Sequence, residues 1–346
     1  MINVAIVGAS GYTGVELARI IHTHPSATLT AATSRQFDGK PLSDVFPNLK
    51  GCTDIICRNH SVEEIIERAD LIFCAVPHKT AMALVPSFIA AGKKVIDLSA
   101  DYRIKDVKTY ESWYQEHSSP ELVAKAVYGL PELYRNTIKE AQLVANPGCY
   151  PTSIILGIIP ALAAGLINHS GIIADSKSGT SGAGRSVSQG TLFCEVNDGF
   201  KPYKVGGLHR HIPEIEQELS IIAKNEVTIT FTPHLLPLSR GILSTIYAPM
   251  TREIEEDQIR DLYRSVYEDT CFVRVLDKGE QPATQYVRGS NFCDIALTID
   301  HRSKRLIVTT ALDNIVKGAS GQAVQNMNIM SGFPEDTGLQ NAPFFP

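Results

Sequence analysis

Cys149 lies in a sequence context that suits a nucleophile. It belongs to the stretch Asn-Pro-Gly-Cys-Tyr-Pro-Thr-Ser at 146–153, which follows an apolar strand expected at 143–145 and precedes an apolar helical pattern at 154–166. Cys149 is therefore expected on a turn at or near a helix N-terminus. Free backbone N–H groups and the positive end of the helix dipole stabilise a thiolate there, lowering the thiol pKa from its usual value of about 8.5. The context predicts a thiolate able to perform covalent catalysis.

The other cysteines indicate a reducing environment rather than a second site. The chain has seven cysteines, an odd number without a C-x-x-C pair, which fits neither a disulfide framework nor a zinc knuckle. Cys74 lies inside the apolar run Leu-Ile-Phe-Cys-Ala-Val and is expected in a buried strand. No metal site is expected, because no cluster of Cys, Asp or Glu accompanies the histidine pair at 209 and 211.

A glycine-rich turn could bind a dinucleotide. Glycines occur at 8, 11 and 14, after a strand expected at 2–7 and at the start of a helical pattern at 12–22. Such glycines let the backbone turn tightly, approach a pyrophosphate and leave it at the helix N-terminus. The spacing is GxxGxxG instead of the usual GxGxxG, so a purely structural turn is the alternative. The residues expected to contact the cofactor are Gly8, Ser10, Gly11, Tyr12, Thr13 and Gly14.

The end of the second strand indicates which dinucleotide is bound. A carboxylate about 20 positions after the glycines would hold the 2′-hydroxyl of NAD, whereas an arginine accommodates the 2′-phosphate of NADP. Here the strand expected at 27–33 is followed by Ser34 and Arg35, and no carboxylate occurs before Asp38. This pair predicts NADP(H); the alternative is an ordinary surface arginine in a loop.

Two further segments could contact substrate. Arg103 follows the end of a strand expected at 94–98, where ligands bind in open α/β sheets, and an arginine fork suits a phosphate dianion. The alternative is a salt bridge within its own loop. The segment 178–185 has too many glycines for a regular strand or helix, and its exposed N–H groups could approach substrate or cofactor, or it could be only a flexible loop. Its candidate ligands are Ser178, Gly179, Ser181 and Gly182.

The elements that must position these residues follow two different patterns along the chain. Up to about residue 150, short apolar strands at 2–7, 27–33, 71–76 and 94–98 alternate with helical patterns, including 61–68, where Ser61 and Glu64 form a capping box. This alternation predicts a Rossmann-type, doubly wound parallel sheet. Strands at 227–231, 242–249, 295–299 and 306–311 follow with fewer helices between them. They predict a second, α+β domain with a mixed or antiparallel sheet.

Helical spacing returns at 313–330, and that segment is expected to pack on the first domain. The expected division is therefore an NADP-binding domain at 1–148 plus 313–346, and a catalytic, substrate-binding and oligomerisation domain at 149–312.

Composition favours small-molecule chemistry. The 346 residues are 44% hydrophobic and 20% charged, and the formal net charge is −5. That charge lacks the basic surplus needed to bind a nucleic-acid backbone or an anionic membrane. The N-terminus enters the stretch Val4–Val7 without a basic leader, and no apolar run approaches the roughly 20 residues that span a bilayer. A cytoplasmic protein without membrane or nucleic-acid partners is expected.

Seven motifs in order along residues 8–328 resemble the N-acetyl-gamma-glutamyl-phosphate reductase family, which belongs with the aspartate-semialdehyde dehydrogenases. They are GASGYTGVEL, DLSADYR, GLPELYR, NPGCYPTS, SGTSGAGR, HRHIPEI and DNIVKGASGQAVQNMN. The resemblance implies NADPH-dependent reduction of N-acetylglutamyl 5-phosphate to the 5-semialdehyde through a thioester, in arginine biosynthesis. It also implies a homodimer or homotetramer formed through the sheet of the second domain.

Residue by residue, the resemblance places the catalytic cysteine on Cys149 and a histidine acid/base on His209 or His211. Two histidines at i and i+2 point opposite ways in an extended segment, so only one should face the sulfur, and His209 is favoured. The resemblance also gives Arg103 a role in holding the substrate phosphate. Arg210 and Ser181 are further substrate-binding candidates, and Asn314 and Gly318 are expected beside the nicotinamide.

Two kinds of alternative remain. An enzyme of the same mechanism could act on an aspartyl phosphate or on a carrier-linked aminoadipyl phosphate. A protein of a different class, a non-catalytic NADP-binding sensor, would need the glycine turn but would have no use for Cys149 and the histidine pair.

Overall fold

The computed structural model describes residues 1–345, which form two compact units. Unit 1 consists of Met1–Pro147 and Ala319–Asn341, and unit 2 of Gly148–Gly318 with the residues from Ala342 onward. The segment 313–318, expected with the first domain, thus belongs to unit 2. The reason is local, because the Asp313 carboxylate and the Asn314 amide oxygen accept backbone N–H groups of Gly289 and Gly241, which are residues of unit 2.

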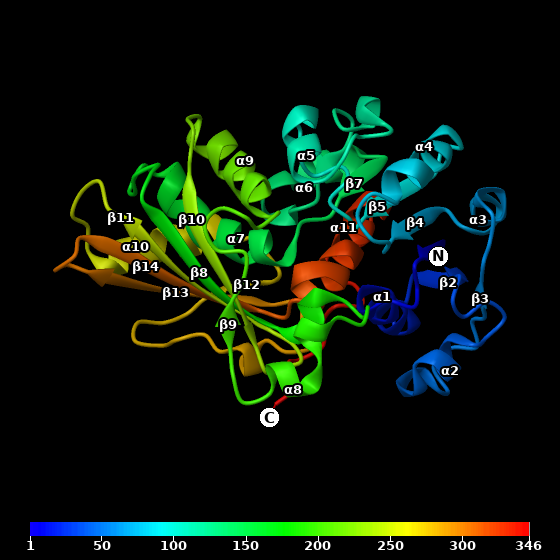
Figure 1. The fold of residues 1–346 in the computed structure, drawn as a ribbon. Helices are drawn as coiled ribbons and strands as arrows, with labels where there is room; N and C mark the ends of the chain where they lie inside the picture. Colours follow the sequence, from blue (N-terminus) through cyan, green and yellow to red (C-terminus); the bar gives the residue numbers. More distant parts are fainter. Residues whose placement is uncertain (346) are drawn as a thin grey trace. The chain divides into compact units, whose positions relative to one another are not determined.

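Unit 1 contains a seven-stranded sheet in the order β3-β2-β1-β4-β5-β7-β6, in which every pairing is parallel (Figure 1). The predicted doubly wound sheet is confirmed. From β1 the chain first builds outward through β2 and β3 and then returns to place β4 on the other side of β1, and the carboxyl ends of strands at such a reversal are where open α/β sheets bind ligands. The strands are β1 (Ile2–Val7), β2 (Ala27–Thr33), β3 (Cys57–Arg58), β4 (Leu71–Cys74), β5 (Lys94–Asp97), β6 (Val127–Tyr128) and β7 (Leu143–Ala145).

The helices of unit 1 begin where the sequence supplies start signals. α1 covers Tyr12–His22 as predicted, and the predicted capping box of α3 is present, with the Glu64 N–H donating to the Ser61 hydroxyl and the Ser61 N–H to the Glu64 carboxylate. The predicted helix at 313–330 is shorter, because residues Val316–Ser320 form a π-helical turn before α11 begins. The other helices are α2 (Leu42–Val45), α3 (Val62–Arg68), α4 (Ala81–Ala90), α5 (Val107–Trp113), α6 (Pro131–Glu140) and α11 (Gly321–Ser331).

Unit 2 contains a mixed seven-stranded sheet in the order β12-β13-β14-β11-β8-β10-β9. β8 pairs parallel with β10 and β12 parallel with β13, whereas the other pairings are antiparallel. β8, a central strand, was missed by the sequence prediction, because its glycine-rich end reads as a loop. The strands are β8 (Ile172–Gly179), β9 (Lys201–Pro202), β10 (Ile229–Leu236), β11 (Ile242–Pro249), β12 (Val273–Val275), β13 (Cys293–Asp300) and β14 (Arg305–Leu312).

One face of this sheet is covered by helices. Gly157 of α7 lies against the side chains of Ile246, Val308 and Thr310, and α9 and α10 pack beside α7 (Figure 1). Along β11 the residues on this face are buried and the intervening residues, such as Thr245 and Tyr247, are only half-buried. The other face therefore lacks a helical layer within unit 2. The helices are α7 (Cys149–Ala163), α8 (Phe193–Val196), α9 (Ile212–Ala223) and α10 (Glu256–Tyr267).

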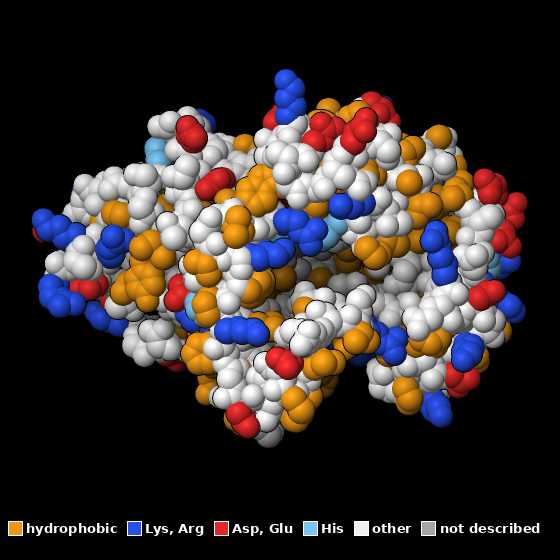
Figure 2. Space-filling model, in the orientation of Figure 1, with side chains coloured by type: hydrophobic (Ala, Val, Ile, Leu, Met, Phe, Trp, Pro, Cys, Tyr) orange, Lys and Arg blue, Asp and Glu red, His pale blue; other side chains and the backbone are white. Residues whose placement is uncertain are grey.

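The surface carries charges of both signs. Figure 2 shows Lys and Arg side chains as well as Asp and Glu side chains spread over the face that it presents. Within residues 1–345, no helix combines the length and the apolar character needed to cross a bilayer.

Candidate active site

Cys149 is the first residue of α7, so the expected placement at a helix N-terminus is confirmed. The helix starts earlier than the predicted residue 154, because Pro151 lies in the first turn, where a backbone N–H is not needed for the helix. Gly148 is the N-cap, and no side chain caps the helix. The partly exposed Cys149 thiol therefore lies where backbone dipoles favour its thiolate form.

Glu214 holds the turn that carries Cys149. Its carboxylate, in the first turn of α9 and only 1% exposed, accepts the backbone N–H of Gly148 at 2.8 Å. A buried carboxylate that accepts an N–H fixes the position of the donor. Glu214 was not predicted as a site residue, although it belongs to the motif that supplied the histidines. Its position at the start of a predicted helix, three residues after the second histidine, could have indicated that Glu214 lies in the site.

His209 and His211 lie together rather than on opposite faces. Their ring centroids are 4.8 Å apart, and each ring makes an edge contact with Tyr150, at 5.6 Å and 6.0 Å. The argument from an extended segment was wrong, because the chain turns at His211, which has helical dihedrals and caps α9. His209 is the more buried of the two, at 8% exposure, and its Nδ1 accepts the backbone N–H of His211 at 3.1 Å.

Two tyrosines, Tyr150 beside Cys149 in the chain and Tyr203, contact these histidines. Tyr203 donates its hydroxyl to that of Tyr150 at 3.1 Å, and its ring contacts His209 at 5.6 Å. Burial raises the pKa of Tyr150 far above its ordinary value and that of Tyr203 to about 12, with the negative charge of the Cys149 thiolate as a further cause in both. Both phenols are therefore neutral at physiological pH. Unit 2 thus brings together Cys149, two tyrosines and the histidine pair.

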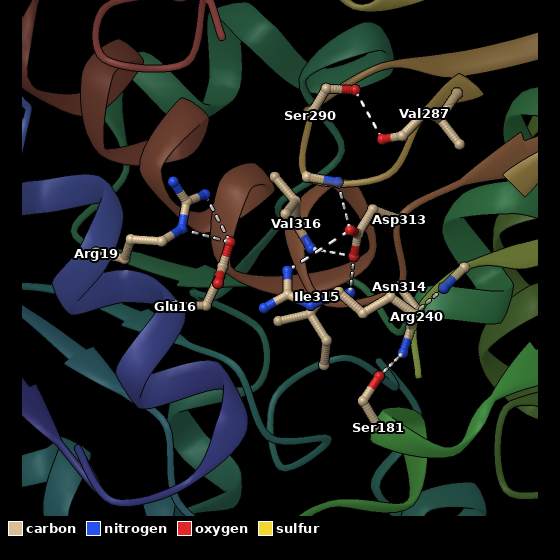
Figure 3. A network of polar contacts seen from close by, with 12 residues as sticks. Glu16, Arg19, Ser181, Arg240, Val287, Ser290, Asp313, Asn314, Ile315 and Val316 are labelled. Carbon is tan, nitrogen blue, oxygen red and sulfur yellow. Dashed lines mark hydrogen bonds and ion pairs between the residues drawn. The ribbon is translucent and has the colours of Figure 1, made fainter. Parts of the chain in front are cut away.

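Gly318, the last residue of the main segment of unit 2, lies against Cys149, its second residue. A Cβ atom at this position would lie 2.7 Å from Cβ of Cys149, so only glycine fits. Asp313 shapes the turn leading to it by accepting the backbone N–H groups of Gly289, Ile315 and Val316, as Figure 3 shows. Asp313 is fully buried and was also missed by the sequence prediction.

The predicted ligands at 178–182 form the end of a strand, not a free loop. Ser178 and Gly179 complete β8, and Thr180–Ala183 form a 3-10 turn. Asn314 anchors this turn, because its amide donates to the Ser181 hydroxyl at 3.0 Å and accepts the Gly241 N–H at 2.7 Å (Figure 3). Gly182 lies beside the Ser178 hydroxyl, since a Cβ there would be 3.1 Å from it. Arg210, half-buried, lies between the two histidines in the chain.

The glycine turn of unit 1 has the close contacts expected of a dinucleotide loop. A Cβ on Gly8 would lie 2.4 Å from the Ala75 carbonyl oxygen, and one on Gly14 would lie 2.5 Å from the Gly8 carbonyl oxygen. Gly11 has no such constraint, since its nearest neighbour would be 3.8 Å away. α1 then starts at Tyr12, followed by Thr13. It has no capping side chain and no acidic residue in its first turn. This cradle fits an anionic pyrophosphate.

Ser34 and Arg35 lie at the edge of the same cradle. The Ser34 hydroxyl, at the end of β2, donates to that of Ser10 in the glycine turn at 3.0 Å. Arg35 is exposed. The structure thus brings the two predicted parts of the nucleotide site together within unit 1.

Arg103 is held inside unit 1. Only 4% exposed, it donates Nε–H to the Asn146 carbonyl at 2.7 Å and Nη2–H to the Leu98 carbonyl at 2.8 Å. It therefore braces the backbone at the ends of β5 and β7. In the part of the chain that the structure describes, no group of three His, Cys, Asp or Glu side chains could hold a metal ion.

Comparison with known proteins assigns both units. The model of the semialdehyde dehydrogenase NAD binding domain matches residues 3–141, and that of the semialdehyde dehydrogenase dimerisation domain matches residues 149–314. Over the full length of both chains, the protein is 64% identical to N-acetyl-gamma-glutamyl-phosphate reductase of Desulfotalea psychrophila and 58% identical to that of Geotalea daltonii. The chain belongs to the N-acetyl-gamma-glutamyl-phosphate reductase family.

Solved structures show the same fold. Aspartate semialdehyde dehydrogenase II from Vibrio cholerae has a TM-score of 0.72 at 17% identity, covering 96% of this chain and 98% of that one. Aspartate semialdehyde dehydrogenase from Candida albicans, solved with NADP, has a TM-score of 0.68 at 15% identity, with coverage of 96% and 98%. The fold resemblance that the motifs implied is thereby confirmed.

Proposed function

We propose that this protein reduces N-acetyl-L-glutamyl 5-phosphate to N-acetyl-L-glutamate 5-semialdehyde and phosphate with NADPH, in arginine biosynthesis. The choice of substrate rests on the names of relatives that match this chain over its full length. The observation that carries the chemistry is Cys149 at the N-terminus of α7, among Tyr150, Tyr203 and the histidine pair. A non-catalytic NADP-binding sensor would have no use for this arrangement.

Cys149 supplies a covalent route. Its thiolate attacks the acyl carbon, a C–S bond forms, the C–O bond to phosphate breaks, and phosphate departs with that electron pair. The thioester then accepts hydride at the same carbon, and collapse of the thiohemiacetal re-forms the carbonyl and returns the C–S electron pair to sulfur. A thioester carbon is more electrophilic than a carboxylate carbon, so one difficult reduction becomes two easier steps.

The cofactor supplies the hydride when bound. For its pyrophosphate we propose the glycine cradle and the start of α1, and for its 2′-phosphate the pair Ser34 and Arg35. Ser178, Gly179, Gly182, Asn314 and Gly318 are the proposed cofactor contacts from unit 2.

For the acyl phosphate, we propose Arg103, Arg210 and Ser181 as ligands. Arginine suits phosphate because its planar fork donates two hydrogen bonds at once. Arg103 would act as a cation in a fixed position, because two backbone carbonyls already orient its guanidinium. Of the two histidines, His209 is the one that we assign to the acyl oxygen, because it is the more buried.

We propose that the protein is a cytoplasmic homodimer or homotetramer. Three observations support this. Unit 2 matches a dimerisation domain and leaves one sheet face without a helical layer. All seven cysteines are free thiols, as expected in a reducing compartment.

The decisive test is the reverse reaction, reduction of NADP with N-acetylglutamate semialdehyde and phosphate, compared with aspartate semialdehyde. We expect turnover only with the first substrate. Turnover with the second instead would contradict the proposed substrate but keep the mechanism.

Cys149→Ser should lower turnover by at least about 10³-fold, because a hydroxyl is a far weaker nucleophile than a thiolate. NADPH binding, measured by fluorescence titration, should be nearly unchanged. Cys194→Ser, which removes an exposed thiol of the same unit, is the matched control and should retain full activity. Substantial turnover by the Cys149 variant would refute the nucleophile assignment.

A further inference from the structure

One loop of unit 2, at 287–292, is covered by the segment 342–345. The loop precedes β13 directly. The backbone N–H of Phe344 donates to the Arg288 carbonyl at 2.8 Å, which holds the segment to the loop. The same residue also places its ring on the loop.

The Phe344 ring occupies the space in which Gly289 has no side chain. A Cβ on Gly289 would lie 2.3 Å from Cδ2 and 2.5 Å from Cε2 of the ring. Gly289 also has a φ of +77°, a backbone conformation that favours glycine. Gly289 is buried, whereas Phe344 is 58% exposed. The ring therefore lies between Gly289 and the solvent on this side of the loop.

The ring covers a hydrogen bond made by the loop. The Gly289 N–H donates to Oδ2 of the fully buried Asp313 at 2.7 Å, and Oδ1 of Asp313 accepts the N–H groups of Ile315 and Val316 (Figure 3). The Arg240 guanidinium lies 3.6 Å from the same Oδ2, beyond the usual hydrogen-bond distance. The loop thus fixes one oxygen of a carboxylate whose other oxygen shapes the next turn.

The sheet explains why the loop and Asp313 meet. Cys293, the first residue of β13, is paired with Leu312, the last residue of β14, in an antiparallel ladder. The loop therefore enters the sheet at the point where Asp313 leaves it. Beyond Leu312 the ladder no longer holds the chain, so the position of Asp313 depends on its own hydrogen bonds.

Asp313 is connected to Cys149 through Gly318. The Gly318 N–H donates to the Asp313 backbone carbonyl at 2.9 Å. A Cβ on Gly318 would lie 2.7 Å from Cβ and 3.2 Å from Cα of Cys149. The turn cannot move toward Cys149 without pushing it, and movement away would remove its support. A series of direct contacts inside unit 2 therefore runs from Phe344 to Cys149.

We propose that Phe344 is a positioning residue for Cys149. Its ring shields the hydrogen bond from Gly289 to Asp313 and thereby holds Gly318 in place. Without the ring, water competes for the Asp313 carboxylate, and the turn that follows it moves more freely. A displaced sulfur attacks the acyl carbon more slowly, because the reacting atoms must be closely aligned. This inference rests on the proposed function, in which Cys149 is the nucleophile.

Hydrogen exchange of the free enzyme, followed by mass spectrometry, tests the structural part without turnover. In Phe344→Ala we expect the amides of 287–292 and of 313–318 to exchange at least about 5-fold faster than in wild type, because both segments lose the shielded bond. The amides of β11 should exchange as in wild type. A change limited to 287–292, or an equal change throughout unit 2, would overturn the proposal.

Steady-state kinetics tests the effect on the reaction. Phe344→Ala should lower kcat about 10-fold, whereas Phe344→Tyr, which keeps the ring atoms that touch Gly289, should stay within about 2-fold of wild type. Phe345→Ala is the matched control, because this exposed ring contacts that of Tyr286, at 6.0 Å, and should keep full activity. Equal losses in the two alanine variants, or no rescue by tyrosine, would refute the positioning role.

A double-mutant cycle tests the route through Asp313. Asp313→Asn leaves one side-chain oxygen for N–H groups that two oxygens accept in wild type. If Phe344 acts through Asp313, adding Phe344→Ala to this variant should lower kcat by less than about 2-fold, whereas independent effects would multiply. A further 10-fold loss, on the order seen in the single variant, would contradict the route.

The exchange experiment also separates this proposal from the proposed function. If wild-type protein bound NADPH but did not reduce the acyl phosphate, the proposed function would fail. Exchange at 313–318 in Phe344→Ala would still decide whether Phe344 holds the turn against Cys149, and it would decide the same if Asp313→Asn did not fold.

Discussion

Arg35 is the residue on which the choice of cofactor depends. It is exposed, it follows the Ser34 hydroxyl that bonds to Ser10 of the glycine turn, and no carboxylate stands at the end of β2 to hold a 2′-hydroxyl. A charge-assisted hydrogen bond contributes about 1.5–3 kcal/mol, which corresponds to roughly 10- to 150-fold in affinity.

Arg35→Ala should therefore raise KM for NADPH by at least about 10-fold and leave KM for NADH nearly unchanged. Lys50→Ala, which removes an exposed cation of the same unit, is the control. Steady-state kinetics with both cofactors measures the effect. If the preference for NADPH over NADH stayed unchanged, Arg35 would be an ordinary surface residue that does not bind the 2′-phosphate.

Gly318 is a second residue at which a single added side-chain atom should change the site. Gly318→Ala would bring its Cβ to 2.7 Å from Cβ of Cys149. Overpacking of this kind costs about 1–3 kcal/mol, and the displaced thiol should lose at least about 10-fold in its alkylation rate. Gly190→Ala, where a Cβ meets nothing within 4 Å, should change neither quantity. Wild-type alkylation kinetics in the Gly318 variant would mean that α7 shifts without cost.

At the scale of elements, α7 and α9 together position Cys149. α7 offers its N-terminus to Cys149, and α9 places Glu214 so that its carboxylate fixes the Gly148 N–H. The histidines come from the turn that leads into α9. The relative position of these two helices therefore controls both the thiolate and its neighbours.

Glu214→Ala leaves the buried Gly148 N–H without this acceptor, which should lower the free energy of unfolding by about 1–3 kcal/mol. Glu214→Gln keeps an oxygen acceptor and should lose less. Glu226→Ala, an exposed carboxylate just beyond α9, is the control. Urea unfolding and Cys149 alkylation report stability and reactivity. Equal stability of the alanine variant and wild type would contradict the positioning role of Glu214.

At the scale of the whole molecule, assembly should depend on the helix-free face of the sheet in unit 2. Thr245 lies near its middle, paired with Thr309, and is half-buried. A charged side chain buried without a partner is strongly unfavourable.

Thr245→Arg should therefore shift the protein from dimer or tetramer toward monomer in sedimentation velocity. Thr137→Arg, on the exposed side of α6, should not change the oligomeric state. An oligomer that survives the Thr245 substitution would place the interface elsewhere.

The sequence by itself determined the parts of this protein that depend on local rules. Apolar alternation and helix start signals indicated the strands and helices of unit 1, including the bounds of α1, and glycine spacing indicated the tight turn before α1. The motif around Cys149 indicated a helix N-terminus, which depends only on neighbouring residues.

Only the tertiary structure decided how distant segments meet. The turn that brings His209 and His211 together, the bond from Glu214 to Gly148 and the fit of Gly318 against Cys149 join residues up to 169 positions apart. Nothing in local composition encodes such contacts, because they depend on how helices and strands pack.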